Sequence, residues 1–220
     1  MFSLLAIVGI VIAGKKVFFG LARHWARHIM FVSRVKLKLR GEEFINPDES
    51  YIFCANHSSI IDIPVMLSAI DHDFRIIYKR ELHKIPVFGW ALALSPFISI
   101  KRENPRDSMI GIEQAVESIR TGESVVIFPE GTRSTDGNIG KFKRGAFMLA
   151  SRSGKKIVPV TIIGSAKVLP NKKFLIQSGE IILQFSAPIE YTCTSKVEEV
   201  KLMNDVYNVL KNNLSEMPKS

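Results

Sequence analysis

The sequence predicts a layered α/β domain, in which helices flank a largely parallel mixed sheet and a helical segment precedes the domain. From Val35 onward, apolar runs of strand length alternate with helix-like stretches. Most of these runs are continuously apolar, which is typical of strands covered on both faces. Hydrophobic residues make up 46% of the 220 residues and charged residues 23%, a balance typical of a globular chain. With no internal repeat or linker, the expected division is 1–34 for the N-terminal segment and 35–220 for one domain.

The N-terminal segment has the composition of a membrane-associated region. Residues 1–14 carry no charge, and Lys15 and Lys16 follow at once. A helix of this length rises about 21 Å, short of the roughly 30 Å hydrocarbon core. Residues 17–33 mix Phe and Trp with Arg and His, as in helices that lie at an interface. We expect two helices, the first dipping into one leaflet and the second lying along its surface. A true membrane span, a signal peptide and packing against the domain remain alternatives.

The predicted strands differ in how they are covered. Val35–Leu39 alternates with lysines, which favours an edge strand. A late strand, Ile181–Phe185, is expected near an edge because Pro188 follows it. The more continuously apolar strands are Tyr51–Ala55, Phe74–Tyr78, Phe97–Ile100, Ser124–Phe128 and Ile157–Ile163.

Helices are predicted between these strands. Pro64 falls inside the first helix and would kink it or delay its start. Asp107 or Ser108 is expected to cap the third, and Gly122 to end it. The predicted helices are Ser58–Ala69, Pro86–Leu94, Arg106–Arg120, Arg144–Ser153 and Lys196–Leu214.

The net charge of +9 favours anionic partners such as lipid headgroups, nucleotide phosphates or acidic carrier proteins. No zinc-finger spacing, RNA-binding aromatic signature or helix-turn-helix pattern occurs, so nucleic acid is not an expected partner. No ligand cluster has the spacing of a metal site. Cys54 and Cys193 do not make a disulfide framework, and Cys54 in its apolar run is expected to be a small buried hydrophobe.

His57 and Asp62 are the candidate base and its orienting acid. His57 follows an apolar strand and precedes a predicted helix, and Asp62 lies five residues further along the chain. Ligands of open α/β sheets bind beyond the carboxyl ends of the strands, where His57 is expected to lie. If Ser58 opens the helix, the Asp62 carboxylate can accept a hydrogen bond from His57 Nδ1 and leave Nε2 free as a base. No G-x-S-x-G elbow occurs, and Ser58 and Ser59 are expected to cap the helix, so the substrate would supply the hydroxyl.

A second loop has the residues of an anion site. Pro129 ends the strand that runs to Phe128, and Gly131 permits a left-handed turn. Arg133 offers a fork of donors that matches phosphate, and Glu130 would order Arg133 or bind a substrate hydroxyl. A salt-bridged surface turn is the structural alternative.

Further basic residues lie near predicted strand and helix ends. Lys143 and Arg144 precede a predicted helix, where they would form a second phosphate cradle, although solvated surface charge is an equal alternative.

These motifs carry a family resemblance. Asn56–Asp62 reads NHSSIID and Phe128–Ser134 reads FPEGTRS. With them the chain resembles the 1-acyl-sn-glycerol-3-phosphate (lysophosphatidic acid) acyltransferases of the glycerolipid acyltransferase superfamily over roughly residues 35–190. Two other segments are similar to family motifs. Val158–Ile162 matches the fourth, and Pro96–Arg102 stands in the place of the second, with Pro96 where glycine is usual and Ser99 where a bulky apolar residue is usual.

The resemblance implies transfer of an acyl group from acyl-CoA or acyl carrier protein to the sn-2 hydroxyl of lysophosphatidic acid, with no other cofactor. It implies that His57 is the general base and Asp62 its orienting partner. It also implies that Glu130, Gly131, Thr132 and Arg133 bind the glycerol phosphate, helped by Arg102 and Lys79, to which the position of Lys143 before a predicted helix adds a third candidate. The membrane lipid acceptor implies association with the membrane surface, at the cytoplasmic face of the cell membrane.

Alternatives follow from the departures in the second motif. The departures leave a different acceptor open, such as a lyso-ornithine lipid or lysophosphatidylglycerol. A thioesterase and a non-catalytic membrane lipid-binding protein are further alternatives, although the presence of His57, Asp62, Glu130 and Arg133 together argues against the second.

Overall fold

The computed structural model describes residues 2–86, 88–101, 104–134, 137–173, 175–191 and 195–216, and the side chains of all of these except residues 2–16 and Phe88. Seven strands form one sheet: β1 (Val35–Arg40), β2 (Ile52–Ala55), β3 (Phe74–Lys79), β4 (Ile98–Ile100), β5 (Ser124–Ile127), β6 (Ile157–Ile163) and β7 (Gly179–Phe185). The helices are α1 (Phe2–Val32), α2 (Asp62–Ala69), α3 (Phe88–Leu94), α4 (Pro105–Arg120), α5 (Gly145–Ser153), α6 (Ser165–Val168) and α7 (Lys196–Ser215), with 3-10 turns η1 (Glu42–Phe44) and η2 (Arg80–Lys84).

The sheet has the strand order β1-β7-β6-β2-β5-β3-β4. Neighbouring strands are parallel except β6 and β7, which run antiparallel. The predicted mixed, largely parallel sheet is therefore confirmed, with β1 at an edge and β7 beside it. Because β2, β5, β3 and β6 are parallel, their carboxyl ends meet at one edge of the sheet.

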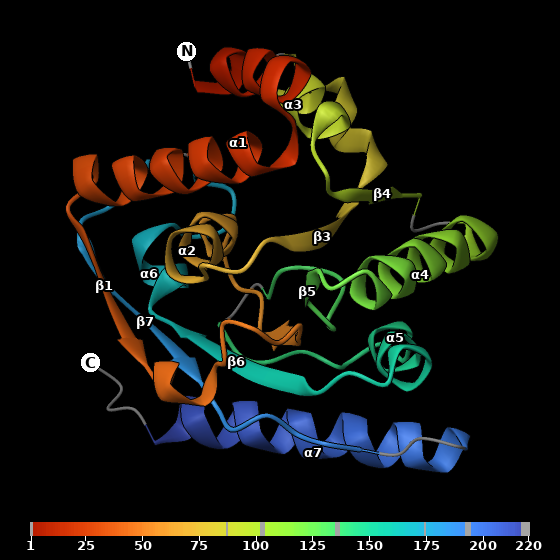
Figure 1. Cartoon of the computed structure of the whole chain (residues 1–220). Coiled ribbons are helices and arrows are strands. Elements are labelled where there is room, and N and C mark those ends of the chain that lie inside the picture. The colour runs from red at the N-terminus through yellow and green to blue at the C-terminus, as the bar shows by residue number, and fades with distance from the viewer. Residues whose placement is uncertain are drawn as a thin grey trace.

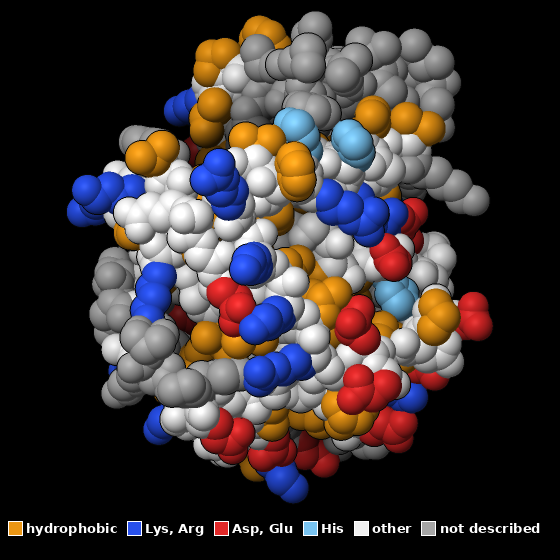
Figure 2. Space-filling view, turned by 90° about the vertical axis from the view of Figure 1, so that its left-hand side faces the viewer, with side chains coloured by type: hydrophobic (Ala, Val, Ile, Leu, Met, Phe, Trp, Pro, Cys, Tyr) orange, Lys and Arg blue, Asp and Glu red, His pale blue; other side chains and the backbone are white. Residues whose placement is uncertain are grey.

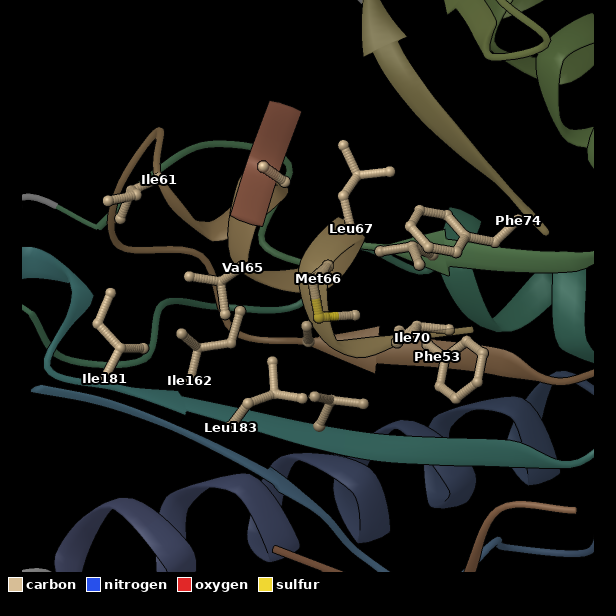
Figure 3. Packing of buried hydrophobic residues seen from close by; sticks show 14 of the residues in the cluster. Phe53, Ile61, Val65, Met66, Leu67, Ile70, Phe74, Ile162, Ile181 and Leu183 are labelled. Atoms are coloured by element: carbon tan, nitrogen blue, oxygen red, sulfur yellow. The ribbon is translucent and has the colours of Figure 1, made fainter. Parts of the chain in front are cut away.

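Helices cover both faces of the sheet. Helices α1, α2 and α6 pack on one face, and α4, α5 and α7 pack on the other (Figure 1). Figure 3 shows how α2 contributes to the first layer: Val65 and Met66 lie over Ile162 and Leu183 of the sheet. Burial on both faces explains why the central strands are continuously apolar.

The N-terminal segment differs from the expected pair of helices. It is one helix, α1, and the buried side chains of Phe18, Phe19, Ala26 and Met30 show that its second half contributes to the core. Arg23 bonds to the carbonyls of Ile70 and Asp71 and pairs with Asp73, in the loop that follows α2. Among the residues that the structure describes, no helix combines the length and the hydropathy needed to cross a membrane.

Two local predictions are corrected by the structure, and one element was not predicted. Helix α2 begins at Asp62 rather than Ser58, so Pro64 stands in its first turn, where a missing amide costs no helical hydrogen bond. Asn104, not Asp107 or Ser108, caps α4 by accepting from the amides of Arg106 and Asp107. The Asp107 carboxylate instead pairs with Arg80. The short helix α6 was not predicted, because four residues are too few for a helical pattern.

Candidate active site

His57 and Asp62 form the expected pair at the carboxyl end of β2. His57 Nδ1 lies 2.8 Å from Asp62 Oδ2, and the Asp62 side chain is 0% exposed. The same oxygen accepts from the backbone amides of Ser58, at 2.8 Å, and Ser59, at 2.9 Å. Because those two amides can only donate, Oδ2 must act as an acceptor, so Nδ1 carries the ring proton. The second ring nitrogen, Nε2, is left with its lone pair.

The capping interactions are the reverse of those predicted. The Asp62 carboxylate reaches back to two amides of its own loop, whereas Ser58 and Ser59 make no cap to α2. The Ser58 hydroxyl instead lies 2.9 Å from the Ser165 hydroxyl, and the Ser59 hydroxyl donates to the Leu169 carbonyl at 2.6 Å. The Ser58 and Ser59 amides are therefore bonded to Asp62 and are not available to stabilise an oxyanion.

Two neighbours that the sequence did not single out hold the histidine loop. The Phe128 ring stacks on the His57 ring with centroids 4.2 Å apart, which limits how the imidazole turns. Asn56 accepts from the Ile162 amide at 2.7 Å and donates to the Ile162 carbonyl at 2.9 Å. These bonds tie the residue before His57 to β6. Asn56 is the first residue of one sequence motif and Phe128 the first residue of the other, so membership of the motifs could have pointed to both.

Glu130 joins the two motif loops. Its side chain is buried, and its Oε1 accepts from the His57 amide at 2.8 Å while Oε2 accepts from the Gly140 amide at 2.8 Å. The expectation was that Glu130 would order Arg133 or bind a substrate hydroxyl; the structure shows both oxygens engaged by backbone amides. Burial raises the pKa of this carboxyl.

Glu130→Gln should slow turnover and weaken the fold, because Gln offers one acceptor oxygen where two amides need one each. The amide left unpaired costs about 1–3 kcal/mol, which thermal unfolding would detect. The exposed glutamate Glu43 of η1 supplies the matched control, Glu43→Gln, which should leave the melting temperature unchanged.

This substitution should also change how stability depends on pH. Since the pKa of Glu130 is raised, the folded chain holds the proton of the Glu130 carboxyl group more tightly than the unfolded chain does. The contribution of Glu130 protonation to the free energy of unfolding is complete below the ordinary glutamate pKa of about 4.3. It is lost as the pH rises through the raised pKa of the folded protein. Denaturant unfolding should therefore show the advantage of the wild type over Glu130→Gln shrinking as pH rises; an advantage that grows would contradict the burial argument.

The loop Pro129–Ser134, called the anion loop here after its predicted role, makes the predicted left-handed turn at Gly131. This residue has φ 68°, and a Cβ placed there would meet Lys143 Nζ at 2.9 Å, so the Lys143 side chain lies across the turn. The Lys143 amide also donates to the Pro129 carbonyl at 2.8 Å. Thr132, Arg133 and Lys143 are exposed. The structure therefore brings Lys143 together with the Glu130–Arg133 turn.

The backbone of the next residue connects this turn to the base. The Ser134 amide donates to the His57 carbonyl at 2.8 Å. Because β2 and β5 are neighbours and parallel, the loops that follow them emerge side by side at one edge of the sheet. The loop that carries Arg133 and the loop that carries His57 therefore lie next to each other at this edge.

The other basic residues predicted to bind phosphate differ in where the structure places them. Lys79 is the last residue of β3, beside β5 at the same sheet edge, and is partly buried. Arg102 lies outside the described residues. Arg144 does not join a phosphate cradle: its guanidinium pairs with Glu199 of α7 at 2.9 Å. Within the described parts of the chain, no three His, Cys, Asp or Glu side chains are grouped so that they could hold a metal ion.

Comparisons with known proteins agree with this geometry. The family model described as Acyltransferase matches residues 36–163. The chloroplastic 1-acyl-sn-glycerol-3-phosphate acyltransferase LPAT1 of Arabidopsis thaliana is 33% identical over 171 residues, covering 77% of this chain and 48% of that protein. The 1-acyl-sn-glycerol-3-phosphate acyltransferase of Pseudomonas aeruginosa is 35% identical over 143 residues, covering 63% of this chain and 55% of that protein.

A solved structure shows the same fold. The 1-acyl-sn-glycerophosphate (LPA) acyltransferase PlsC from Thermotoga maritima superposes with a TM-score of 0.80 at 26% identity, covering 94% of this chain and 82% of that chain. The chain spans about half the length of the first curated relatives it matches. The family model nevertheless covers more than half of the chain, including both motif loops. The chain therefore belongs to the acyltransferase family.

Proposed function

We propose that the protein transfers an acyl group from acyl-CoA or acyl carrier protein to the sn-2 hydroxyl of lysophosphatidic acid, giving phosphatidic acid. The names of the relatives support this acceptor. The observation that carries the chemistry is the His57–Asp62 pair, whose Nε2 is the free base, joined through Glu130 and Ser134 to the anion loop.

In the proposed mechanism, Arg133 binds the acceptor's phosphate, helped by Lys143, and by Arg102 and Lys79. His57 Nε2 takes the proton of the sn-2 hydroxyl, and the resulting alkoxide attacks the thioester carbonyl. The tetrahedral intermediate expels the thiolate, which recovers the proton from His57. Asp62 stabilises the imidazolium that exists between the two proton transfers. Thr132 and Gly131 complete the turn that presents Arg133.

The nearby candidate nucleophiles support direct transfer to the acceptor. The Ser58 and Ser59 hydroxyls are buried and hydrogen-bonded to Ser165 and to the Leu169 carbonyl. Cys54 is fully buried in β2, and burial raises the pKa of its thiol far above the usual range, which disfavours the reactive thiolate. An acyl-enzyme on these residues is not part of the proposal.

An acceptor panel tests the proposal. Purified protein would receive labelled acyl-CoA or acyl carrier protein together with lysophosphatidic acid, lysophosphatidylglycerol or a lyso-ornithine lipid. Formation of labelled phosphatidic acid as the preferred product supports the proposal, and preference for another acceptor contradicts it. Running both donors against one acceptor also identifies the donor, and free fatty acid released without any acceptor would indicate a thioesterase.

The second-motif region supplies the reason to keep the other acceptors in the panel. The Pro96 carbonyl accepts a hydrogen bond from the buried guanidinium of Arg75, which is also paired with Glu123. This bond uses the backbone carbonyl, which a glycine would also offer, so it places residue 96 in the fold but does not explain proline where the family usually has glycine. The change stands a few residues before Arg102 in the sequence, a residue expected to bind phosphate.

Arg133→Ala should act mainly on the lysolipid. Loss of a charge-assisted phosphate contact should lower kcat/KM for the acceptor by about 10²-fold, with little change in KM for the acyl donor. Steady-state kinetics with each substrate varied in turn measures the split. Arg120→Ala, at an exposed position in the last turn of α4, is the matched control. Acceptor kinetics that stay at the wild-type level would remove Arg133 from phosphate binding.

We also propose that the protein associates with the membrane surface through α1 and α3. Helix α3 packs against α1 and presents Trp90 and Leu94, four residues apart and therefore on one face, at 57% and 45% exposed. Lys84 and Ile85, which come just before α3 in the chain, are also exposed. A tryptophan among apolar residues with lysine nearby suits the headgroup region of a bilayer.

The distribution of charge supports this orientation. On the face shown in Figure 2, Asp and Glu side chains are densest in the lower part, with some in the middle and on the right, whereas Lys, Arg and His side chains extend over the middle and upper parts, with some Lys and Arg also near the bottom. The upper part corresponds to the α1 side of Figure 1 and the lower part to the α7 side. The acidic part would then point away from anionic lipids.

Tryptophan fluorescence tests the proposed contact. The chain has two tryptophans, and Trp25 packs against the core, so Trp25→Phe leaves Trp90 as the reporter. Vesicles that contain phosphatidylglycerol should shift its emission to shorter wavelength, because the indole leaves water. Trp90→Phe, which leaves Trp25, should show no comparable shift. Vesicle binding without any change in Trp90 emission would contradict a role for α3.

A further inference from the structure

One segment outside both motifs contacts both motif loops. We call residues 164–171 the brace; they comprise α6 and the residues on either side of it. The brace meets the His57 loop through Ser165, whose hydroxyl lies 2.9 Å from that of Ser58, and through the Leu169 carbonyl, which accepts from Ser59 at 2.6 Å. It meets the anion loop through Asn171 Nδ2, which donates to the Ser134 carbonyl. The brace therefore connects the base to the phosphate-binding turn.

The brace is itself tightly held by the sheet. Gly164 has φ 88°, and a Cβ there would lie 2.5 Å from the Glu180 carbonyl oxygen of β7, so α6 begins against the backbone of the sheet. The Gln177 amide donates to the Val168 carbonyl at 2.8 Å, and Val168 is buried. Lys172, directly after Asn171, has φ 65°, a left-handed conformation that is uncommon for a residue with a side chain. Such a conformation persists where surrounding contacts impose it.

Asn171 binds Ser134, the residue that links the loop of the proposed base, His57, to the turn that carries Arg133. The Ser134 amide is bonded to the His57 carbonyl, and the Ser134 carbonyl is bonded to Asn171. Ser134 directly follows Arg133 in the chain. Both polar groups of the Ser134 backbone are thus used to set Arg133 relative to His57. The Arg133 side chain is exposed, and the backbone from which it extends is held by these bonds.

We propose that Asn171 is a positioning residue for acyl transfer: it sets the spacing between Arg133 and His57 so that one acceptor molecule reaches both. The phosphate and the reacting hydroxyl of a lysophosphatidic acid are separated by a fixed number of bonds. A change in the spacing of the base and the phosphate clamp therefore lowers the rate for this acceptor. The inference rests on the proposed role of Arg133 in binding the acceptor's phosphate.

Asn171→Asp is the sharpest substitution, because it keeps the side-chain shape and replaces the donating NH₂ by an oxygen. The Ser134 carbonyl then loses its donor and faces a second acceptor. We expect kcat/KM for the acceptor to fall by about tenfold or more, with KM for the acyl donor unchanged. Asn208→Asp makes the same chemical change on an exposed position of α7 and should leave both values unchanged. Asn171→Ala, which adds no charge, should give a loss of similar size, and thermal unfolding verifies that each variant is folded.

A double-mutant cycle with Arg133→Ala separates positioning from general structural damage. If Asn171 acts through Arg133, Asn171→Asp should cost less than about twofold once Arg133 is absent. A loss of equal size in both backgrounds, or wild-type kinetics for Asn171→Asp, would overturn the proposal. Failure of the proposed function would appear differently, as a wild-type protein that prefers another acceptor; the cycle is then measured with that acceptor. A protein that acylates no member of the panel contradicts both proposals.

Discussion

His57→Ala should lower kcat by about 10²–10⁴-fold, the usual contribution of a general base, while the protein remains folded. Among the described residues, His57 is the side chain that hydrogen-bonds to Asp62, and this bond at Nδ1 leaves Nε2 for the proton transfer. Without the imidazole, the buried Asp62 carboxylate loses one donor but keeps the amides of Ser58 and Ser59, so the protein should remain folded with a modest fall in melting temperature. Labelled acyl transfer to lysophosphatidic acid measures the loss.

His28→Ala, at an exposed position of α1, is the matched control and should retain wild-type turnover. A His57→Ala protein that retains more than about a tenth of wild-type turnover would contradict the assignment of the base.

Asp62→Asn should separate the charge of Asp62 from its hydrogen bonds. All three bonds to this carboxylate converge on Oδ2, and Oδ1 has no partner among the described residues. An asparagine can therefore place its oxygen at the Oδ2 position and keep every bond, including the one that sets the tautomer of His57. What it lacks is the negative charge that stabilises the imidazolium. We expect kcat to fall, but by a clearly smaller factor than in His57→Ala, with little loss of stability.

Asp62→Ala should be worse in both respects. It leaves the Ser58 and Ser59 amides without their acceptor, which costs about 1–3 kcal/mol each where they are buried, and it releases the imidazole. Turnover should fall as far as in His57→Ala, and the double variant His57→Ala/Asp62→Ala should lose little more, because the two residues act as one unit. An Asp62→Asn loss as large as that of His57→Ala would contradict the tautomer argument.

The parts of the fold that could be predicted are those that depend on local pattern. Continuous apolar runs identified the central strands, because burial on both faces leaves no polar positions. The spacing of His57 and Asp62 identified the pair, since five residues at a strand-to-helix junction return the chain close to its start. Gly131 was identified because a left-handed turn favours glycine.

The parts that could not be predicted depend on contacts between distant residues. Glu130 binds its two amides across the fold at His57 and Gly140, so its sequence neighbours do not reveal this role. Arg144 is drawn away from the anion loop by Glu199, which lies on α7. Helix α2 starts late because Asp62 accepts from the amides of Ser58 and Ser59, an arrangement that no capping pattern encodes.

A crystal structure with lysophosphatidic acid bound and no acyl donor present tests the central claim most directly. We predict that its phosphate contacts the Arg133 guanidinium and that its sn-2 hydroxyl oxygen lies within about 3 Å of His57 Nε2. A lysolipid whose phosphate binds away from Arg133, or whose hydroxyl points away from His57, would contradict the account.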